Sequence, residues 1–249
     1  MPSAAERSRI RVDELASQVR HQMIPLSQSF SYFSVTPLGA EEIKQYVEEP
    51  LAALPPALTA LIPKVEILLT PYLEKRNGRG GGDFAGSERP SNTRQIPCSR
   101  VVTGQGVTLA FAIKDEDLAD YHYSFYNGLA AMVASAGGEP LKEFTEHVRE
   151  ELRADVHGEV DDKSWRLKQA LLRRPSVVTK ESKAFQDYVR QAFEDTLTLY
   201  LHGICCDIDV EPGPRQMPSR SIRRRLELLL RHFPPPTGYA VLPEQVRRR

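Results

Sequence analysis

Strand-forming and helix-forming segments are segregated along this chain. The most regular strand pattern covers residues 101–113, and after Ile113 the apolar residues change to helical spacing over most of the remaining chain. Within that strand region bulky and small residues alternate, so one face of the strand carries bulky side chains and the other carries small ones. The bulky residues are Val107, Leu109, Phe111 and Ile113, and the small ones are Thr108, Ala110 and Ala112. This segregation favours an α+β fold with a helix-rich C-terminal half.

The strand-forming segments predict a small, mostly antiparallel sheet packed against several helices. We expect its strands around residues 30–35, 64–73 and 99–113. Gly104-Gln105-Gly106 suits a hairpin turn inside the last of these segments. Apolar spacing and capping residues predict helices over 5–23, 37–49, 117–136, from Pro140, from Asp162, over 180–201 and over 221–232.

Domain organisation follows from length and from two segments of unusual composition. A chain of 249 residues suits one compact domain, which we expect to span 1–249. Residues 75–95 contain three successive glycines and predict a flexible loop. Residues 212–249 are basic and flanked by prolines, and they predict a C-terminal tail.

Cysteine usage and hydropathy indicate a compartment. The 3 cysteines form no disulfide framework, which is typical of cytoplasmic proteins. The first residues lack the apolar core of a signal peptide, and the longest apolar run, 51–63, is too short to span a bilayer. We therefore expect a soluble, cytoplasmic protein without a membrane partner.

The neutral net charge conceals two oppositely charged segments. Residues 115–162 hold 13 carboxylates and 3 basic side chains, a charge of −10. Residues 163–249 hold 17 basic and 9 acidic side chains, a charge of +8. The basic segment either neutralises the acidic one, within one chain or across an oligomer interface, or binds another acidic partner.

Two alternating segments are candidates for a metal site. In an extended strand, alternate residues share one face. The carboxylates and the histidine of 155–161 would then lie on one face of their strand, and the carboxylates of 207–211 would lie on one face of theirs. Oxygen and nitrogen ligands on one face suit a divalent metal. The alternative is a polar loop and a half-buried strand with solvated charges. The metal candidates are Asp155, His157, Glu159, Asp207 and Asp209.

A third acidic pattern lies on the helix predicted from Pro140. Glu143, His147 and Glu151 are spaced at i, i+4 and i+8, so they share a stripe. The same helix has an apolar stripe elsewhere, which favours a solvated role for the acidic one.

Arginine-rich segments are candidates for anion or partner binding. The partner that we favour is a second copy of the chain or another protein, and nucleic acid is less favoured because the net charge is zero. The candidate residues are Arg220, Arg223, Arg224, Arg225 and Arg231.

The functional prediction is a binding or assembly protein that associates through charge-polarised surfaces. It rests on the charge asymmetry and on the lack of a nucleophile elbow, P-loop or dinucleotide motif in the sequence, so catalytic residues are unknown. The alternative is a metal-dependent hydrolase or nuclease that uses the carboxylate and histidine site. A divalent metal is implied as a cofactor only under that alternative.

Overall fold

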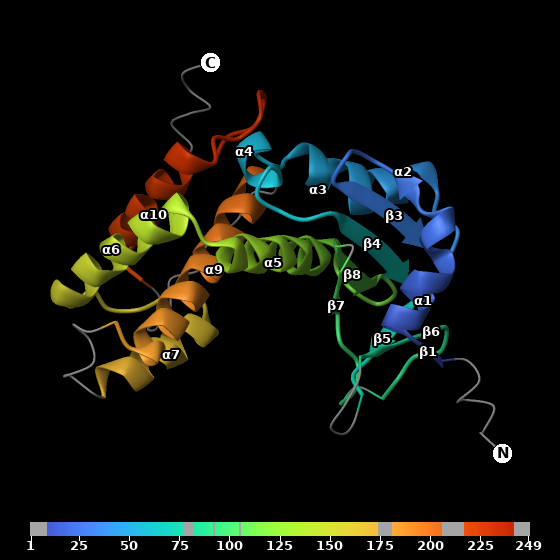
Figure 1. Ribbon diagram of the computed structural model, residues 1–249, viewed down its shortest axis with the longest axis horizontal. Helices are drawn as coiled ribbons and strands as arrows, with labels where there is room; N and C mark the ends of the chain where they lie inside the picture. The colour runs from blue at the N-terminus through green and yellow to red at the C-terminus, as the bar shows by residue number, and fades with distance from the viewer. Residues whose placement is uncertain are drawn as a thin grey trace. The chain divides into compact units, whose positions relative to one another are not determined.

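The computed structural model has the predicted α+β architecture (Figure 1). It describes residues 9–76, 82–91, 93–104, 106–173, 181–205 and 217–241. The chain divides into two compact units, where the sequence predicted one domain. The sheet unit comprises Met1–Leu51 and Ile62–Gly128, and the helical unit comprises Ala52–Leu61 and Leu129–Arg249.

The sheet unit is built around a five-stranded sheet of order β2-β3-β4-β8-β7. All three segments predicted to form strands contribute to the two sheets of this unit. The central pairs β3–β4 and β4–β8 are parallel, which we did not foresee, whereas the outer pairs β2–β3 and β7–β8 are antiparallel. The strands are β2 (Ile24–Pro25), β3 (Phe30–Ser34), β4 (Val65–Thr70), β8 (Gly106–Ala112) and β7 (Cys98–Thr103).

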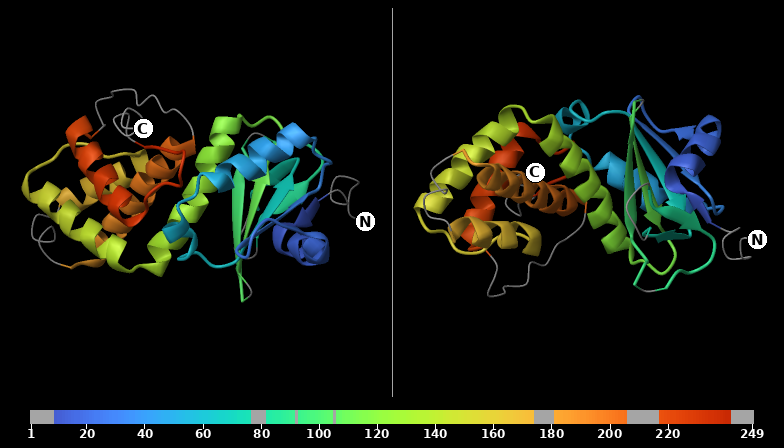
Figure 2. Two further views of the ribbon diagram at one scale, coloured as in Figure 1. Left: turned by 90° about the horizontal axis from the view of Figure 1, so that it is seen from above. Right: turned by 60° about the horizontal axis from the view of Figure 1, so that its bottom comes forward.

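The two faces of β8 are covered by different helices, as their contrasting side-chain sizes require (Figure 2). On the small face, Ala110 and Ala112 pack in one cluster with Val12 and Val19 of α1 (Val12–Val19). On the bulky face, the ring of Phe111 contacts the ring of Tyr121 from α5 (Leu118–Ala136), with centroids 5.0 Å apart. Parallel strands need both faces covered, and every residue of β4 is buried.

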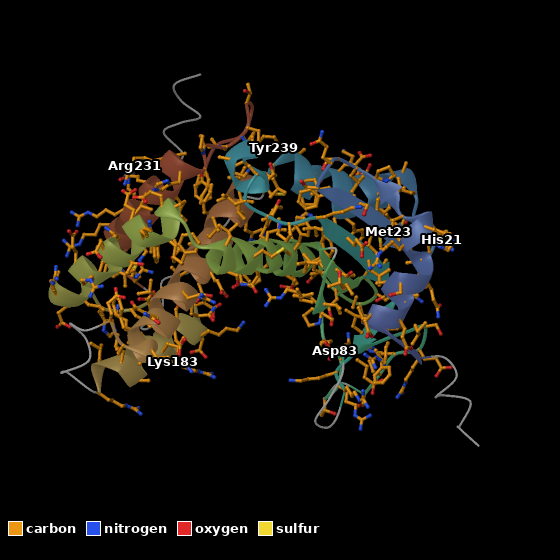
Figure 3. The ribbon with its side chains drawn as sticks, in the orientation of Figure 1. His21, Met23, Asp83, Lys183, Arg231 and Tyr239 are labelled. Atoms are coloured by element: carbon orange, nitrogen blue, oxygen red, sulfur yellow. The ribbon has the colours of Figure 1, made fainter. Side chains whose placement is uncertain are left out.

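A second sheet of order β1-β6-β5 completes the sheet unit. Its strands are β1 (Arg9–Arg11), β6 (Phe84–Gly86) and β5 (Tyr72–Glu74), all paired antiparallel. The helix predicted over 5–23 is wrong at 9–11, and the loop predicted over 75–95 contains β6. In both cases cross-strand pairing of Ala85 with Ile10 and Leu73 outweighs local preference. Asp83, labelled in Figure 3, accepts hydrogen bonds from Val12 N and from Ser99 Oγ.

The helical segment after β3 continues through a proline. It comprises α2 (Ala40–Ile43), a π-helical turn η3 (Lys44–Glu48) and α3 (Glu49–Ala52), so the predicted start at residue 37 and end at Pro50 are wrong. Pro50 has no N–H to donate, which deprives carbonyls one turn earlier of a helical partner. Tyr121 Oη donates to Tyr46 O at 2.5 Å, and His122 Nε2 lies 2.9 Å from Gln45 O. Side chains of α5 thereby supply partners for carbonyls near Pro50.

The helical unit is arranged around α9 (Lys183–Cys205), which contacts α6 (Glu139–Arg153), α7 (Asp162–Leu172) and α10 (Ser219–His232). A short helix, α4 (Pro56–Thr59), also belongs to this unit. These helices agree with the predicted ones to within a few residues, although Asp161 rather than Asp162 caps α7. Within the segment 212–249, predicted as a C-terminal tail, α10 buries Leu228 and Leu229. No described helix has the length and apolar character needed to cross a membrane.

Candidate functional site

A buried arginine lies at the centre of the helical unit. Arg225 of α10 has no exposed side-chain surface and binds two carboxylates. Its Nη2 donates to Glu151 Oε2 of α6 at 2.6 Å, and its Nη1 donates to Glu159 Oε2 at 2.8 Å. The ring of Phe144 lies beneath the guanidinium, 5.4 Å from its carbon to the ring centroid. The side chain is therefore paired on its polar edge and packed on its face.

Two further side chains complete this buried ion network. Lys168 of α7 donates to Glu159 Oε1 at 3.3 Å and to the carbonyls of Val156 and Gly158, both at 2.8 Å. Tyr188 of α9 donates its hydroxyl to Glu159 Oε1. The network thus joins α6, α7, α9, α10 and the segment that connects α6 to α7. Two cations balance two anions, as burial of charge requires.

The pKa values of the network follow from burial and pairing. Burial alone would raise the pKa of Glu159, but the charges of Arg225 and Lys168 outweigh it and hold that pKa below its usual value. Burial alone would lower the pKa of Arg225, and the nearby Glu159 and Glu151 carboxylates raise it instead. For Lys168 burial dominates and lowers the pKa. The shifts of Glu159 and Arg225 both favour the charged form of the side chain at neutral pH.

An open groove lies between α6 and α10 beside this network, and Figure 3 labels one of its lining residues, Arg231. Its volume is about 320 Å³, within the range of small-molecule sites. Seven of its eight lining residues are charged or titratable. The α6 wall is Glu143, Glu146, His147 and Glu150, and the α10 wall is Arg224, Glu227, Leu228 and Arg231.

Ion pairs between the two helices connect the walls of the groove. Arg231 and His232 of α10 both bind Glu143 of α6, with His232 Nε2 2.6 Å from Glu143 Oε2. Hydrogen bonds from these two side chains lower the pKa of Glu143. Together with Arg225 and Glu151, these contacts fix the spacing of the groove walls. The acidic and basic segments of the sequence therefore neutralise each other here within one chain.

The acidic stripe on α6 was predicted to be solvated, and this prediction is wrong for one of its residues. Glu151 is buried rather than solvated, because it faces Arg225. His147 lies between the groove and the network, with Nε2 3.3 Å from Glu151 Oε1 but not oriented for a hydrogen bond. Glu143 is partly exposed, as expected.

The segment 155–161 does not form the extended strand on which its metal hypothesis depends. Asp155 and Gly158 have positive φ angles of 49° and 80°, so alternation breaks down. Asp155 and His157 are exposed, whereas Glu159 is buried and paired. In the described parts of the chain, no group of three His, Cys, Asp or Glu residues is placed to hold a metal. Asp207 and Asp209 lie outside the described residues, so their role stays a prediction.

The five candidate arginines have different environments. Arg225, predicted to bind an anion or a partner, is buried and pairs with Glu151 and Glu159 of its own chain. Arg223 pairs with Glu227 at 3.0 Å, and Arg231 pairs with Glu143. Arg220 and Arg224 are exposed, one helical turn apart, and neither forms an ion pair with any residue that the structure describes.

The buried network was missed, although its sequence contains a signal. Arg225 precedes the buried Leu228 and Leu229 by three and four residues, so it belongs to the core stripe of its helix. Glu151 follows the buried Phe144 by seven residues and the buried Val148 by three, so it also belongs to a core stripe. Opposite charges at core positions of different helices indicate a buried ion pair, because an unpaired buried charge is too costly.

Comparison with protein-family models, with curated proteins and with solved structures finds no match to this chain.

Proposed function

We propose that this chain is a binding and assembly protein that associates with further copies of itself through oppositely charged surfaces. The observation that carries the proposal is a pair of exposed clusters of opposite sign. Arg220 and Arg224 form the basic cluster on α10 of the helical unit. Asp117 and Asp120, at the start of α5 in the sheet unit, are exposed and lack a described ion-pair partner.

The acidic cluster is crowded with like charges. The pKa of Glu116 is raised by burial first, and then by the neighbouring charges of Asp120, Asp115 and Asp117. Only Asp115 has a described cationic partner, Arg89, at 3.6 Å. An external cation that approached Asp117 and Asp120 would relieve this repulsion.

The basic cluster is displayed on a rigid support. Arg220 and Arg224 precede Arg225 on the same helix, and the buried ion pairs of Arg225 hold α10 against its neighbours. A contact between the basic cluster of one copy and the acidic cluster of the next is heterologous, so it continues head to tail unless it closes into a ring.

Light scattering at two salt concentrations tests the proposal. The Debye length falls from about 30 Å at 0.01 M salt to about 3 Å at 1 M, so association should weaken strongly between these conditions. Arg220→Glu/Arg224→Glu and Asp117→Lys/Asp120→Lys should each abolish self-association at low salt. A chain that is monomeric under both salt conditions contradicts the proposal.

Charge exchange gives a sharper test. A mixture of the two doubly substituted chains should associate again, because each now offers the charge that the other needs. Lys163→Glu/Arg166→Glu on α7 is the matched control, since it reverses two exposed charges away from both clusters. If the control disrupts association as strongly as the other variants, the effect is one of net charge and the assigned clusters are wrong.

A further inference from the structure

Among the residues that the structure describes, one acid and one base of the α6–α10 groove lack an ion-pair partner. Arg231 and His232 bind Glu143, Arg223 binds Glu227 at 3.0 Å, and Arg149 lies 3.5 Å from Glu146. After these pairs are assigned, Glu150 on the α6 wall and Arg224 on the α10 wall have no ion-pair partner among the described residues. Both side chains are exposed.

The two unpaired charges face one cavity but do not meet. No nitrogen of Arg224 lies within 4.0 Å of a Glu150 oxygen, although both residues line the same groove. A ligand that carries an ammonium group and a carboxylate could satisfy both walls at once. Charge-assisted hydrogen bonds of this kind are shorter and stronger than neutral ones, and guanidinium can bind carboxylate through two of them.

The remaining lining restricts the rest of the ligand. Leu228 is the apolar member of the lining set and is only 3% exposed, so it offers a small apolar contact at the base of the groove. The volume of about 320 Å³ suits a compact molecule rather than a folded domain. Since buried and partly buried ion pairs already fix the two helices that form the walls, the ordering cost on binding is limited mainly to the side chains of Glu150 and Arg224.

We propose that the α6–α10 groove binds a zwitterionic amino acid or short peptide. Glu150 receives the ammonium group, and Arg224 receives the carboxylate. This inference goes beyond the proposed self-assembly, because it assigns a small-molecule ligand to the groove. The groove shares Arg224 with the basic cluster, whereas Glu150 belongs to neither assembly cluster.

Calorimetric titration of the full chain tests the ligand class. The probes are L-leucine and the dipeptide Leu-Leu, with 3-methylbutylamine and 4-methylpentanoate as analogues that lack one of the two charges. At least one zwitterion should bind, and each singly charged analogue should bind about tenfold more weakly, as the loss of one charged hydrogen bond implies. The two zwitterions distinguish a free amino acid from a peptide. The proposal is overturned if neither binds or if a singly charged analogue binds equally well.

Conservative variants test the residues. Glu150→Gln and Arg224→Gln should each weaken zwitterion binding about tenfold or more, because each removes a charge from one wall. Glu139→Gln and Arg166→Gln, which neutralise exposed charges outside the groove, are matched controls and should bind normally. Binding that survives both groove substitutions would overturn the assignment.

Light scattering on the same variants separates this inference from self-assembly. Glu150 belongs to neither assembly cluster, so Glu150→Gln should lose ligand and still associate. If the native chain proves monomeric, the groove is still tested by titration of the monomer.

Discussion

Arg225 and Glu159 form an ion pair of 2.8 Å in which neither side chain has any exposed surface. Such pairs contribute less to stability than their geometry suggests, because both ions lose their hydration. Their loss is nevertheless costly, since the partner that remains is a buried, uncompensated charge. In this chain the same arginine compensates Glu151 as well, so one side chain neutralises carboxylates on two segments.

Replacement of this arginine should destabilise the helical unit. We expect Arg225→Met to lower the free energy of unfolding by about 3–5 kcal/mol, because Glu151 and Glu159 lose their shared cation. Urea denaturation followed by circular dichroism measures the change. Arg223→Met is the control, since Arg223 is exposed and its pair with Glu227 should contribute less than about 1 kcal/mol. Equal effects of the two substitutions would contradict a special role for the buried pair.

Acid should destabilise the chain through Glu159. The pKa of Glu159 is lower in the folded state than its unfolded value of about 4.3. The contribution of Glu159 to the free energy of unfolding is therefore fully present above the unfolded pKa, and it is lost as the pH falls through the folded pKa. The free energy of unfolding should therefore fall below about pH 4. In Glu159→Gln this fall should be less steep.

A comparison within the same titration checks the sign. Burial raises the pKa of Asp195 in the folded state. The free energy of unfolding therefore depends on this group in the opposite sense: the contribution of Asp195 is lost as the pH rises through its folded pKa. In Asp195→Asn the fall in stability below about pH 4 should be as steep as in the native chain or steeper. An unchanged acid slope in Glu159→Gln would show that Glu159 is not a major source of the pH dependence.

The hydroxyl of Tyr121 should matter because of a proline on another helix. Tyr121→Phe leaves Tyr46 O without its described side-chain donor, and we expect a loss of about 1–3 kcal/mol in unfolding free energy. Pro50→Ala restores a backbone N–H one turn after Tyr46. The cost of Tyr121→Phe should therefore be smaller in the Pro50→Ala background. Additive effects in this double-mutant cycle would show that the backbone N–H at position 50 does not replace the Tyr121 hydroxyl as the donor to Tyr46 O.

Two glycines in one hairpin should respond differently to the same substitution. Gly106 has φ of +151°, and a Cβ there would lie 2.3 Å from Lys64 O, whereas a Cβ at Gly104 meets nothing within 4 Å. Gly106→Ala should destabilise the sheet unit by at least about 1–3 kcal/mol, the cost of a strained backbone conformation alone. Gly104→Ala should change stability by less than about 1 kcal/mol. Thermal unfolding of both variants measures the difference, and similar melting temperatures would contradict the role of the clash.

The fold was predictable where a segment's periodicity agreed with its packing. The bulky and small faces of β8 are the clearest case, because alternation selects a strand and both faces are buried. The strand β1 was not predictable from its own residues, since Ile10 is held by pairing with Ala85, 75 positions away. The parallel direction of β3 and β4 likewise depends on tertiary pairing rather than on local preference.

The candidate site was less predictable than the fold. The sequence identified the charged segments and the helix that became α10, but it grouped Arg225 with Arg220 and Arg224 as surface residues. Helical spacing separates them, because Arg225 shares the register of the buried Leu228 and Leu229. Which carboxylates face Arg225 depends on how four helices pack, and side-chain spacing within one helix does not contain that information.

The position of Arg225 in the sequence also constrains biosynthesis. Ribosomes deliver residues in order, so Glu151, Glu159 and Lys168 emerge before the arginine that neutralises the two carboxylates. Until α10 leaves the exit tunnel, closure of the other helices would bury a net negative charge. The helical unit should therefore reach its native packing only after α10 has emerged, whereas Met1–Leu51 and Ile62–Gly128 of the sheet unit are synthesised before it.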